Sequence, residues 1–348
     1  MKSVVYYELQ RADRMARVQE RRMVQPRVKR SELSTPAEFA GDPIVWAAWL
    51  YYEERMTQEE VAERLGVSRA SVVNFLQEAR DRNIVTIAVA SEHLQSVQIA
   101  RELARRYGLK SCVVIPDGHD DFPVYERIGR AGARLLMDIL EPNDVLGVSW
   151  GRTVLSLSAE LAAAKMPGVT VVQIAGSAIG TKEFSPELCT TNIAYRIGGR
   201  CVNLHAPGIV SRPDVKKLFM QESSLVEQFK LIRSCTKVLF GVANLSDAST
   251  ALRSGYMTPE KIRPYVKRGA VAVMSGRFLD ADGNTVLGAL DEQMIGLTLD
   301  EIAEIPERIC VAGGVEKVQA IRAVLRGEYA TILVTDEPTA RALVDAKD

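Results

Sequence analysis

The sequence predicts an α/β protein of two domains, a small helix-turn-helix domain followed by a doubly wound, largely parallel α/β domain. Three observations support this prediction. Residues 57–84 carry apolar residues at spacings of three, four and seven, which indicates buried helix faces. From Ser111 onward, short β-branched runs alternate with helical stretches, as is typical of a parallel sheet covered on both faces. A length of 348 residues is enough for two hydrophobic cores.

The composition is that of a soluble globular protein, with 47% hydrophobic and 25% charged residues. No signal peptide opens the chain and no apolar run is long enough to span a membrane, so we expect a cytoplasmic protein without a membrane partner. The five cysteines are odd in number, scattered and without metal-ligand spacing, and the three histidines lie far apart. We therefore expect neither a disulfide framework, nor a metal site, nor a cofactor.

Residues 57–84 have the features of a helix-turn-helix. Thr57 is suited to cap a first helix, and Glu60 three residues later completes a capping box. Gly66 can adopt the positive φ of a tight turn, and Ser68 is suited to cap a second helix over about residues 69–80. In such motifs the second helix enters the major groove of DNA with its N-terminal residues facing the bases.

The polar side chains at the start of the second helix fit base recognition. Arg69, Ser71 and Asn74 are exposed by periodicity, and they suit guanine, either base, and adenine, respectively. With the capping residues, the predicted DNA-binding set is Thr57, Ser68, Arg69, Ser71 and Asn74. The alternative is an ordinary helical hairpin whose polar residues face water. The coincidence of caps, turn glycine and apolar residues favours the helix-turn-helix.

The charge balance implies that one copy of this domain binds DNA weakly. The formal net charge of the chain is zero, and residues 41–90 contain five basic against eight acidic residues. Contacts with phosphates supply most of the sequence-independent affinity for DNA. We therefore expect a homodimer or tetramer that presents two such domains to double-stranded operator DNA.

The chain divides into four predicted regions: a basic extension over residues 1–41, the helix-turn-helix domain over 42–90, a linker helix over 91–109 and the α/β domain over 110–348. We expect the extension to be disordered; the alternative is a basic arm that follows the DNA backbone. Residues 44–54 predict a scaffold helix for the second region, and residues 84–90 a short closing strand.

The linker helix carries one continuous apolar stripe that includes Leu94, Val97, Ala100 and Leu103. This stripe either pairs with its counterpart from another subunit or packs on its own C-terminal domain. The pattern favours neither interpretation over the other.

The strand and helix pattern of the C-terminal domain continues to the end of the chain. Strands are predicted near residues 111–115, 145–149, 169–174, 200–204, 236–242, 270–275, 308–312 and 331–334. Helices are predicted near residues 123–140, 153–164, 186–197, 213–220, 222–233, 258–267, 314–326 and 336–346. Ligands bind such sheets outside the carboxyl ends of the strands, so binding residues are expected in the strand-to-helix loops.

Two of these loops combine glycine with a cation. In the first, residues 149–153, Gly151 lets the backbone approach a ligand closely, and Arg152 stands at the start of the next helix. The second, residues 312–317, has two glycines at the turn and Lys317 on the first helical turn. Glycine at such turns often serves packing alone. Two such loops in one sheet, with Arg152 and Lys317, favour a phosphate-bearing ligand.

A resemblance makes this expectation more specific. The segments GVSWGRT, FGVANL, SGRFLDADG and VAGGVEKVQAIRAVLRGEYATILVTDE follow the helix-turn-helix in this order. From about Pro43 to the C-terminus, the chain resembles the SorC/DeoR-type sugar-binding transcriptional regulators. The resemblance implies an effector domain similar to sugar-phosphate isomerases, an effector that is a phosphorylated sugar or polyol, homo-oligomers, and repression of a carbohydrate-catabolic operon. It implies these effector-binding residues: Ser149, Gly151, Arg152, Thr153, Gln173, Asn244, Gly313, Gly314 and Lys317.

The chain departs from this family at one position of interest. Many members carry an acidic residue after a glycine where this chain reads Ala272-Val273. If that carboxylate holds sugar hydroxyls, its replacement by valine changes which sugar is bound.

Two other classes of protein are open to the sequence. The first is a sugar-phosphate isomerase-like enzyme with an attached DNA-binding domain. Its candidate acids (Glu183, Asp247, Asp280, Asp282 and Asp291) all lie in predicted loops, and His205 stands alone, so no acid–base pair is evident. The second is a sigma-factor-like subunit, which residues 43–82 also resemble. The large α/β domain disfavours it.

Overall fold

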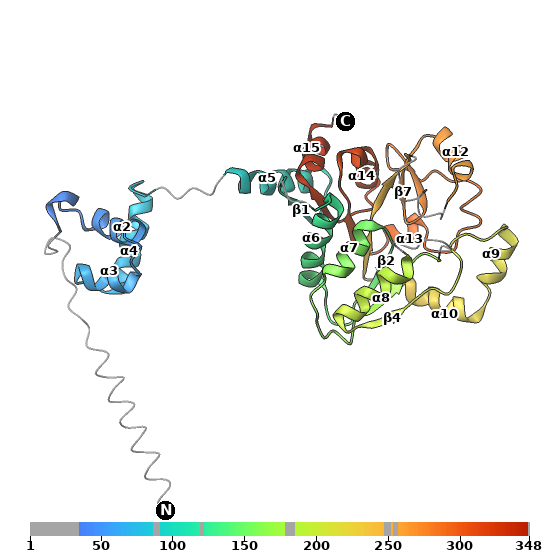
Figure 1. Ribbon diagram of the computed structural model, residues 1–348, viewed down its shortest axis with the longest axis horizontal. Coiled ribbons are helices and arrows are strands. Elements are labelled where there is room, and N and C mark those ends of the chain that lie inside the picture. The colour runs from blue at the N-terminus through green and yellow to red at the C-terminus, as the bar shows by residue number, and fades with distance from the viewer. Residues whose placement is uncertain are drawn as a thin grey trace, which may run out of the picture. The chain divides into compact units, whose positions relative to one another are not determined.

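The computed structural model describes residues 35–85, 91–118, 122–177, 185–246, 252 and 257–346. The chain forms two compact units, residues 1–89 and residues 90–348 (Figure 1). Each unit is treated by itself below. The predicted disordered extension lies outside the described residues, apart from residues 35–41.

The N-terminal unit is a small helical domain. Its elements are the 3-10 helix η2 (Ala37–Phe39) and the α-helices α2 (Pro43–Tyr52), α3 (Gln58–Leu65) and α4 (Arg69–Asp81). Its core consists of the buried side chains of Ala47, Leu50, Val61, Ala62, Leu65, Val72 and Leu76. These residues come from all three α-helices, so the scaffold helix and the helix-turn-helix share one core. Of the predicted strand over residues 84–90, Ile84 and Val85 form bends, and the rest lies outside the described residues.

The predicted helix caps are confirmed. The Thr57 hydroxyl accepts a hydrogen bond from the Glu60 amide at 3.3 Å, and a Glu60 carboxylate oxygen accepts one from the Thr57 amide at 2.7 Å. The Ser68 hydroxyl accepts from the Ser71 amide at 3.2 Å. Gly66 ends α3 with a φ of 67°, a conformation that an L side chain disfavours. These contacts fix where α3 and α4 begin and where α3 ends, and the shared apolar core holds the two helices together.

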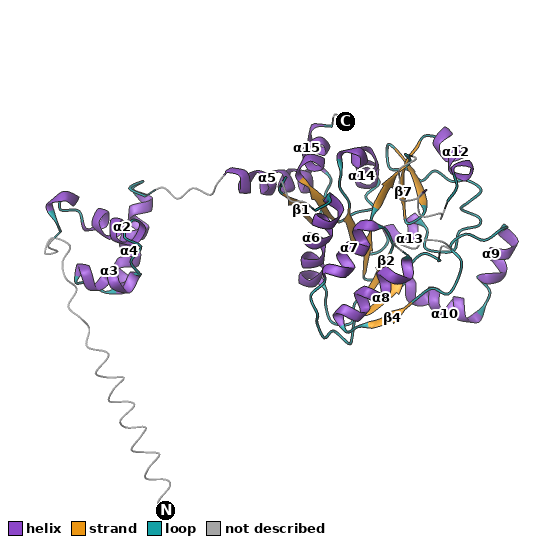
Figure 2. Cartoon of the chain, in the orientation of Figure 1, coloured by secondary structure: helices purple, strands orange, loops and turns teal. Residues whose placement is uncertain are grey.

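The C-terminal unit is built on a seven-stranded parallel sheet (Figure 2). The strand order is β1-β10-β9-β5-β2-β3-β4. The strands are β1 (Ser111–Ile115), β2 (Val145–Val148), β3 (Thr170–Gln173), β4 (Arg200–Val202), β5 (Lys237–Phe240), β9 (Glu307–Val311) and β10 (Ile332–Asp336). The chain runs outward from β2 to β4 and then returns to place β5 on the other side of β2. The sheet therefore reverses its direction of winding between β2 and β5.

Helices cover both faces of this sheet, as predicted for a doubly wound fold. The helices of this unit are α5 (Ser91–Arg106), α6 (Val124–Ile139), α7 (Arg152–Glu160), α8 (Pro186–Ile197), α9 (Pro213–Phe219), α10 (Ser223–Ile232), α12 (Pro259–Lys267), α13 (Leu299–Ala303), α14 (Val318–Arg326) and α15 (Glu337–Asp345). Of these, α12 packs on the β7–β8 hairpin. Buried residues of α6, α7 and α8 form one hydrophobic cluster, and those of α5, α10, α13, α14 and α15 form another. Along β5, Val238 and Phe240 belong to the second cluster and Leu239 to the first, so the clusters lie on opposite faces.

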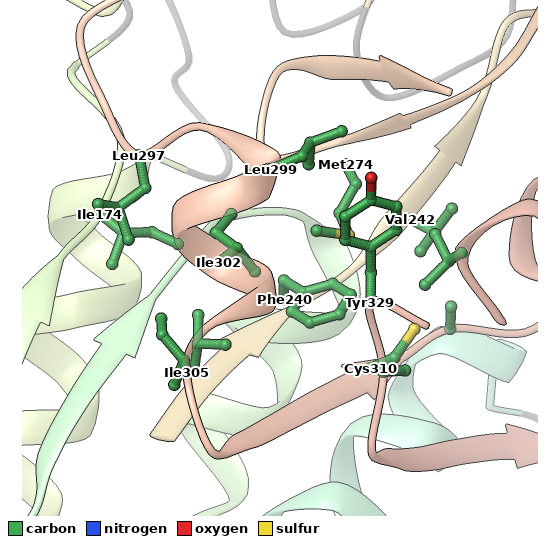
Figure 3. Close-up of a cluster of buried hydrophobic side chains, with 14 of the residues drawn as sticks. Ile174, Phe240, Val242, Met274, Leu297, Leu299, Ile302, Ile305, Cys310 and Tyr329 are labelled. Carbon is green, nitrogen blue, oxygen red and sulfur yellow. The ribbon is translucent and has the colours of Figure 1, made fainter. Parts of the chain in front are cut away.

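Figure 3 shows part of the second cluster, in which Phe240 of β5, Ile302 of α13 and Tyr329 meet. Phe240 and Ile302 are fully buried. Helix α13 was not predicted, because its five residues are too few for helical periodicity to be recognised.

One predicted strand lies in a different sheet. β7 (Ala270–Met274) does not join the parallel sheet but pairs in antiparallel fashion with β6 (Val242–Asn244) and β8 (Arg277–Asp280). The reversal between β7 and β8 occurs at Ser275 and Gly276, whose φ angles are 50° and 83°. Two successive positive φ angles are typical of a tight hairpin turn. An apolar run such as AVAVM is compatible with either type of sheet, so its hydrophobicity alone did not distinguish them.

Helix α5 packs on its own domain. Ala100 and Leu103 are buried in the cluster that also contains residues of α15. Leu94 and Val97, at the other end of the same stripe, are 41% and 49% exposed. The C-terminal half of the stripe thus has its partner within the unit, and pairing of Leu94 and Val97 with another subunit stays a prediction.

Two predicted helices have different limits. α7 ends at Glu160 instead of residue 164, and α14 is preceded by a 3-10 turn, η3 (Val315–Lys317). All five cysteines are free, and Cys189, Cys235 and Cys310 are buried. Within the described part of the chain, no helix combines the length and apolar character needed to cross a membrane.

A buried ion pair lies at the amino ends of the central strands. The Lys237 ammonium is 2.9 Å from a carboxylate oxygen of Asp144 and 3.5 Å from one of Glu307. The Lys237 and Asp144 side chains are each 6% exposed. The Thr236 hydroxyl donates to the other Asp144 oxygen at 2.6 Å. This group ties β2, β5 and β9 together at the edge opposite the carboxyl ends.

Replacing Asp144 by Ala should lower the free energy of unfolding by about 3–5 kcal/mol, because the Lys237 charge then stays buried with only Glu307 nearby. The control is Lys230→Ala, which removes the exposed pair with Glu227 and should cost less than about 1 kcal/mol. Urea unfolding measures both changes. Equal unfolding midpoints for the two variants would contradict this assignment.

Candidate functional site

A pocket lies at the carboxyl ends of the central strands, where the sheet reverses its winding between β2 and β5. It encloses about 490 Å³ of space, including the part open to solvent. Its lining residues come from the loop after β2, the segment after β5, and the hairpin of β7 and β8, and they include Lys317. They are Ser149, Trp150, Gly151, Arg152, Thr153, Val154, Gly241, Val242, Ala243, Val273, Ser275, Gly276 and Lys317.

Five of the predicted effector-binding residues meet in this pocket. Ser149 and Gly151 come from the loop between β2 and α7, Arg152 and Thr153 are the first two residues of α7, and the fifth is Lys317. Gly151 has a φ of 139°, and a Cβ placed on it would touch nothing within 4 Å. Glycine is therefore needed here for its backbone conformation. The backbone at this position is open to a ligand at the start of α7.

Arg152 and Lys317 lie close enough for their charges to interact. Burial lowers the pKa of Lys317 below its usual value, and the Arg152 guanidinium lowers it further, while Glu316 and Asp336 raise it. The Arg152 guanidinium also lies over the ring of Tyr125 on α6, 5.2 Å from its centroid. Two cations from distant parts of the sequence thus share one wall of the pocket.

Gly313 and Gly314 do not line the pocket. A Cβ on Gly313 would lie 2.0 Å from a carboxylate oxygen of Asp336, so this glycine permits close packing. The Gly314 amide donates to that Asp336 oxygen at 2.9 Å and to the Thr339 hydroxyl at 2.8 Å. This amide is therefore engaged within the protein. Gly313 thus permits close packing, and Gly314 provides a backbone φ of 102°; a role of either glycine in effector binding stays a prediction.

Gln173 and Asn244 also lie outside the residues that line the pocket. Gln173 is fully buried; its amide nitrogen donates to the Ala175 carbonyl at 2.7 Å, and its oxygen accepts from the Leu204 amide at 3.0 Å. Asn244 donates to the Glu316 carbonyl at 2.9 Å. Both side chains connect loops of the protein. A polar residue at the end of a strand looks the same in the sequence whether it binds a ligand or a neighbouring loop, so the sequence pattern cannot distinguish the two.

The hairpin of β7 and β8 supplies Ser275 and Gly276, which the sequence did not indicate, and Val273, the position at which the chain departs from the family that it resembles. The Ser275 hydroxyl donates to the Ser149 hydroxyl at 3.0 Å and so joins the hairpin turn to the loop after β2. Val273 lines the pocket from the same hairpin, and Val242 and Ala243 do so from β6. The Ser-Gly dipeptide within the apolar run was the one available signal for this turn.

The candidate catalytic acids are dispersed. Asp280 accepts hydrogen bonds from the Asp282 and Asn284 amides within its own loop. Asp291 pairs with Arg277 at 3.1 Å and accepts a hydrogen bond from the Tyr265 hydroxyl at 2.9 Å. Burial, and then this hydrogen bond, raise the pKa of Tyr265 to about 12. Glu183 and Asp247 lie outside the described residues. Among the described residues that line the pocket, none is an acid or a histidine.

On α4, the predicted base-reading residues separate into two groups. The Arg69 side chain is 66% exposed and contacts two side chains of α3, with its Nε donating to Gln58 at 3.4 Å and lying 3.9 Å from a Glu59 oxygen. Asn74 is exposed. The Ser71 hydroxyl is instead paired with the Ser68 hydroxyl at 3.0 Å, so both serines belong to the cap. Thr57 is likewise engaged with Glu60. Val73, which the sequence analysis did not select, is 44% exposed beside Asn74 and offers an apolar surface of the kind that thymine methyl groups contact.

The chain is similar to known transcriptional regulators along most of its length. Residues 91–345 match a family described as a sugar-binding domain. The chain is 34% identical over 312 residues to the uncharacterized transcriptional regulator YjhU of Escherichia coli K12, with 88% of this chain and 95% of that protein covered. It is 30% identical over 310 residues to the sorbitol operon regulator of Klebsiella pneumoniae, with 86% and 97% covered. The crystal structure of full-length SorC from K. pneumoniae covers 87% of this chain and 98% of its own, with 27% identity and a TM-score of 0.68.

Replacing Arg69 or Asn74 by Ala should leave the fold intact but remove preference for the specific site, at about 1–3 kcal/mol for each base contact. Ser71→Ala, which changes a cap residue on the same helix, is the matched control and should weaken binding to all sequences alike. Gel-shift titration against specific and scrambled DNA separates the two effects. Equal weakening on both DNAs by Arg69→Ala and Asn74→Ala would assign these residues to phosphate contacts.

Proposed function

The chain belongs to the family of transcriptional regulators that carry this sugar-binding domain, and we propose that a sugar or sugar-phosphate effector, bound in the pocket, controls its binding to operator DNA. One observation carries the proposal: Arg152 and Lys317 both line the pocket, close enough for their charges to interact. The two residues are separated by 165 positions in the sequence. We infer that helix α4 reads the operator and that the protein is a repressor of a carbohydrate-catabolic operon.

An anionic group fits this wall of the pocket for electrostatic reasons. Burial is the main cause of the lowered pKa of Lys317, and repulsion between its ammonium and the Arg152 guanidinium lowers that pKa further. An anion between them replaces this repulsion by two charge-assisted hydrogen bonds. The start of α7 adds backbone amides and the positive end of the helix dipole. A phosphorylated sugar or polyol supplies such a group.

The rest of the pocket suits the carbon skeleton of a small carbohydrate. Ser149 and Thr153 present hydroxyl groups from the loop after β2, and Ser275 presents a third from the hairpin turn. Val242 and Val273 add apolar side chains to the lining. This combination supports a ligand with few hydroxyl groups on the side that faces Val273.

A sugar-phosphate isomerase-like enzyme is the second candidate, because the pocket lies where α/β enzymes bind their substrates. The dispersal of the candidate acids and of His205 favours a sensor instead. Incubation with sugar phosphates followed by analysis of the recovered sugars distinguishes the two functions. Conversion of a sugar phosphate at a rate that Lys317→Ala abolishes would establish an enzyme.

Replacing Lys317 by Ala should weaken effector binding about ten- to a hundredfold, because a charge-assisted hydrogen bond contributes about 1.5–3 kcal/mol. DNA binding without effector should stay unchanged. Calorimetry with the best hit of a thermal-shift screen across sugars, polyols and their phosphates measures the first effect, and a gel shift measures the second. The phosphate site would be refuted if the best ligand is an unphosphorylated polyol and the Lys317→Ala variant binds it as tightly as the wild type.

Effector binding should take up protons at alkaline pH. Burial and Arg152 lower the pKa of Lys317, and a bound anion raises it again because it stabilises the ammonium. The affinity is therefore full below the lowered pKa and declines as the pH rises through it. Calorimetry in buffers of different ionisation enthalpy counts the protons. The Lys317→Met variant should show no uptake, and equal uptake by this variant and the wild type would assign the proton elsewhere.

The protein should form a dimer or tetramer. The acidic residues of the N-terminal unit oppose phosphate binding, and Arg80 and Arg82 are engaged within the unit, with the Tyr52 hydroxyl at 3.0 Å and the Asp42 carboxylate at 2.8 Å. Two units on one duplex supply together the contacts that one lacks. Sedimentation at micromolar concentration measures the oligomeric state. The Val97→Glu variant tests whether the exposed half of the α5 stripe forms the contact between subunits. A monomer with and without DNA would contradict the expectation.

A further inference from the structure

Two adjacent acidic residues at the start of α15 connect parts of the C-terminal unit that are far apart in the sequence. Asp336 ends β10 and caps α15, and Glu337 is the first residue of that helix. Their exposures are 4% and 8%. Buried carboxylates are retained only where hydrogen bonds satisfy them, so the partners of these two groups indicate what the junction holds together.

Asp336 holds the turn that carries Lys317. One carboxylate oxygen accepts from the Gly314 amide at 2.9 Å and from the Thr339 hydroxyl at 2.7 Å. The packing of Gly313 against the same oxygen leaves no space for a side chain. The Lys317 amide donates in turn to the Gly314 carbonyl at 2.8 Å. A displacement of Lys317 is therefore passed through Gly314 to the first turn of α15.

Glu337 holds the first helix of the unit. One of its carboxylate oxygens accepts from the Ser96 hydroxyl of α5 at 2.9 Å, and Ser96 is only 4% exposed. The other oxygen accepts from Arg341, whose guanidinium also donates to Gln95 of α5 at 2.9 Å. The second turn of α5 and the start of α15 are thus joined through both oxygens of one buried carboxylate.

α5 is also the element by which the chain enters the C-terminal unit. It begins at Ser91, six positions after Val85, the last described residue of the DNA-reading unit. A shift of its first turn necessarily moves the end of this short connection. Because Ser96 lies on the second turn of α5, the Glu337 contact acts close to that connection.

We propose that the Asp336–Glu337 junction is the link by which an anion bound at Arg152 and Lys317 changes the first turns of α5. The inference rests on the proposed function, since it assumes that the pocket binds an anion. The anion draws Lys317 and its turn toward Arg152, Asp336 follows through Gly314, and Glu337 transmits the shift to Ser96. An anion has this effect only because it binds one arrangement of the turn better than the other.

The test is hydrogen exchange of the full chain with and without inorganic phosphate as the anion probe. In the wild type, phosphate should slow the exchange of residues 149–153 and 313–317 and also of residues 91–98. The Ser96→Ala variant removes the contact with Glu337 without touching the pocket. It should keep the slower exchange at the pocket and lose the phosphate-dependent change in residues 91–98.

Tyr107→Phe is the matched control, because it removes a hydrogen bond between the same two helices at the other end of α5, from the Tyr107 hydroxyl to the Leu343 carbonyl at 3.4 Å. It should behave as the wild type. An equal change of residues 91–98 in Ser96→Ala and wild type would overturn the link and leave the proposed pocket intact. No effect of phosphate on residues 149–153 and 313–317 in the wild type would overturn the anion site and, with it, the link.

Discussion

Arg152 and Lys317 bring two positive charges to one pocket, and this convergence of like charges is the constraint on which the proposed effector site depends. The elements that carry the two residues lie on opposite sides of β5. Arg152 stands at the start of α7 after β2, and Lys317 on the turn after β9. Under the proposed function, an anion between these two like charges forms charge-assisted hydrogen bonds with both and offsets their repulsion.

The surrounding structure serves to hold these charges in place. The buried Lys237–Asp144 pair fixes the amino ends of the central strands, and Asp336 fixes the turn of Lys317 at their carboxyl ends. The hairpin that carries Ser275 closes the third side through its contact with Ser149. The pocket is therefore lined by four segments: the loop after β2, the segment after β5, the hairpin of the antiparallel sheet and the turn of Lys317. A ligand that contacts several of these segments at once can favour one arrangement of them over another.

Features that depend on neighbouring residues were predicted well from the sequence, and contacts between residues distant in the sequence were predicted poorly. Strand–helix alternation and the caps at Thr57 and Ser68 are local, so their signals lie within a few residues. The sequence also predicted that Arg152 and Lys317 converge, because both follow strands whose carboxyl ends share one edge. The sequence could not show that Gln173 and Asn244 bond to neighbouring loops, or that β7 leaves the main sheet. Those outcomes depend on partners that are distant in the chain, such as Leu204 for Gln173.

The central claim is that one anionic group binds both cations. A crystal structure of the full chain with the best effector from the thermal-shift screen tests this most directly. The account predicts an oxygen of the effector within about 3.2 Å of the Lys317 ammonium and another within the same distance of the Arg152 guanidinium. An effector bound elsewhere, or bound in the pocket with no polar atom near either cation, would contradict it.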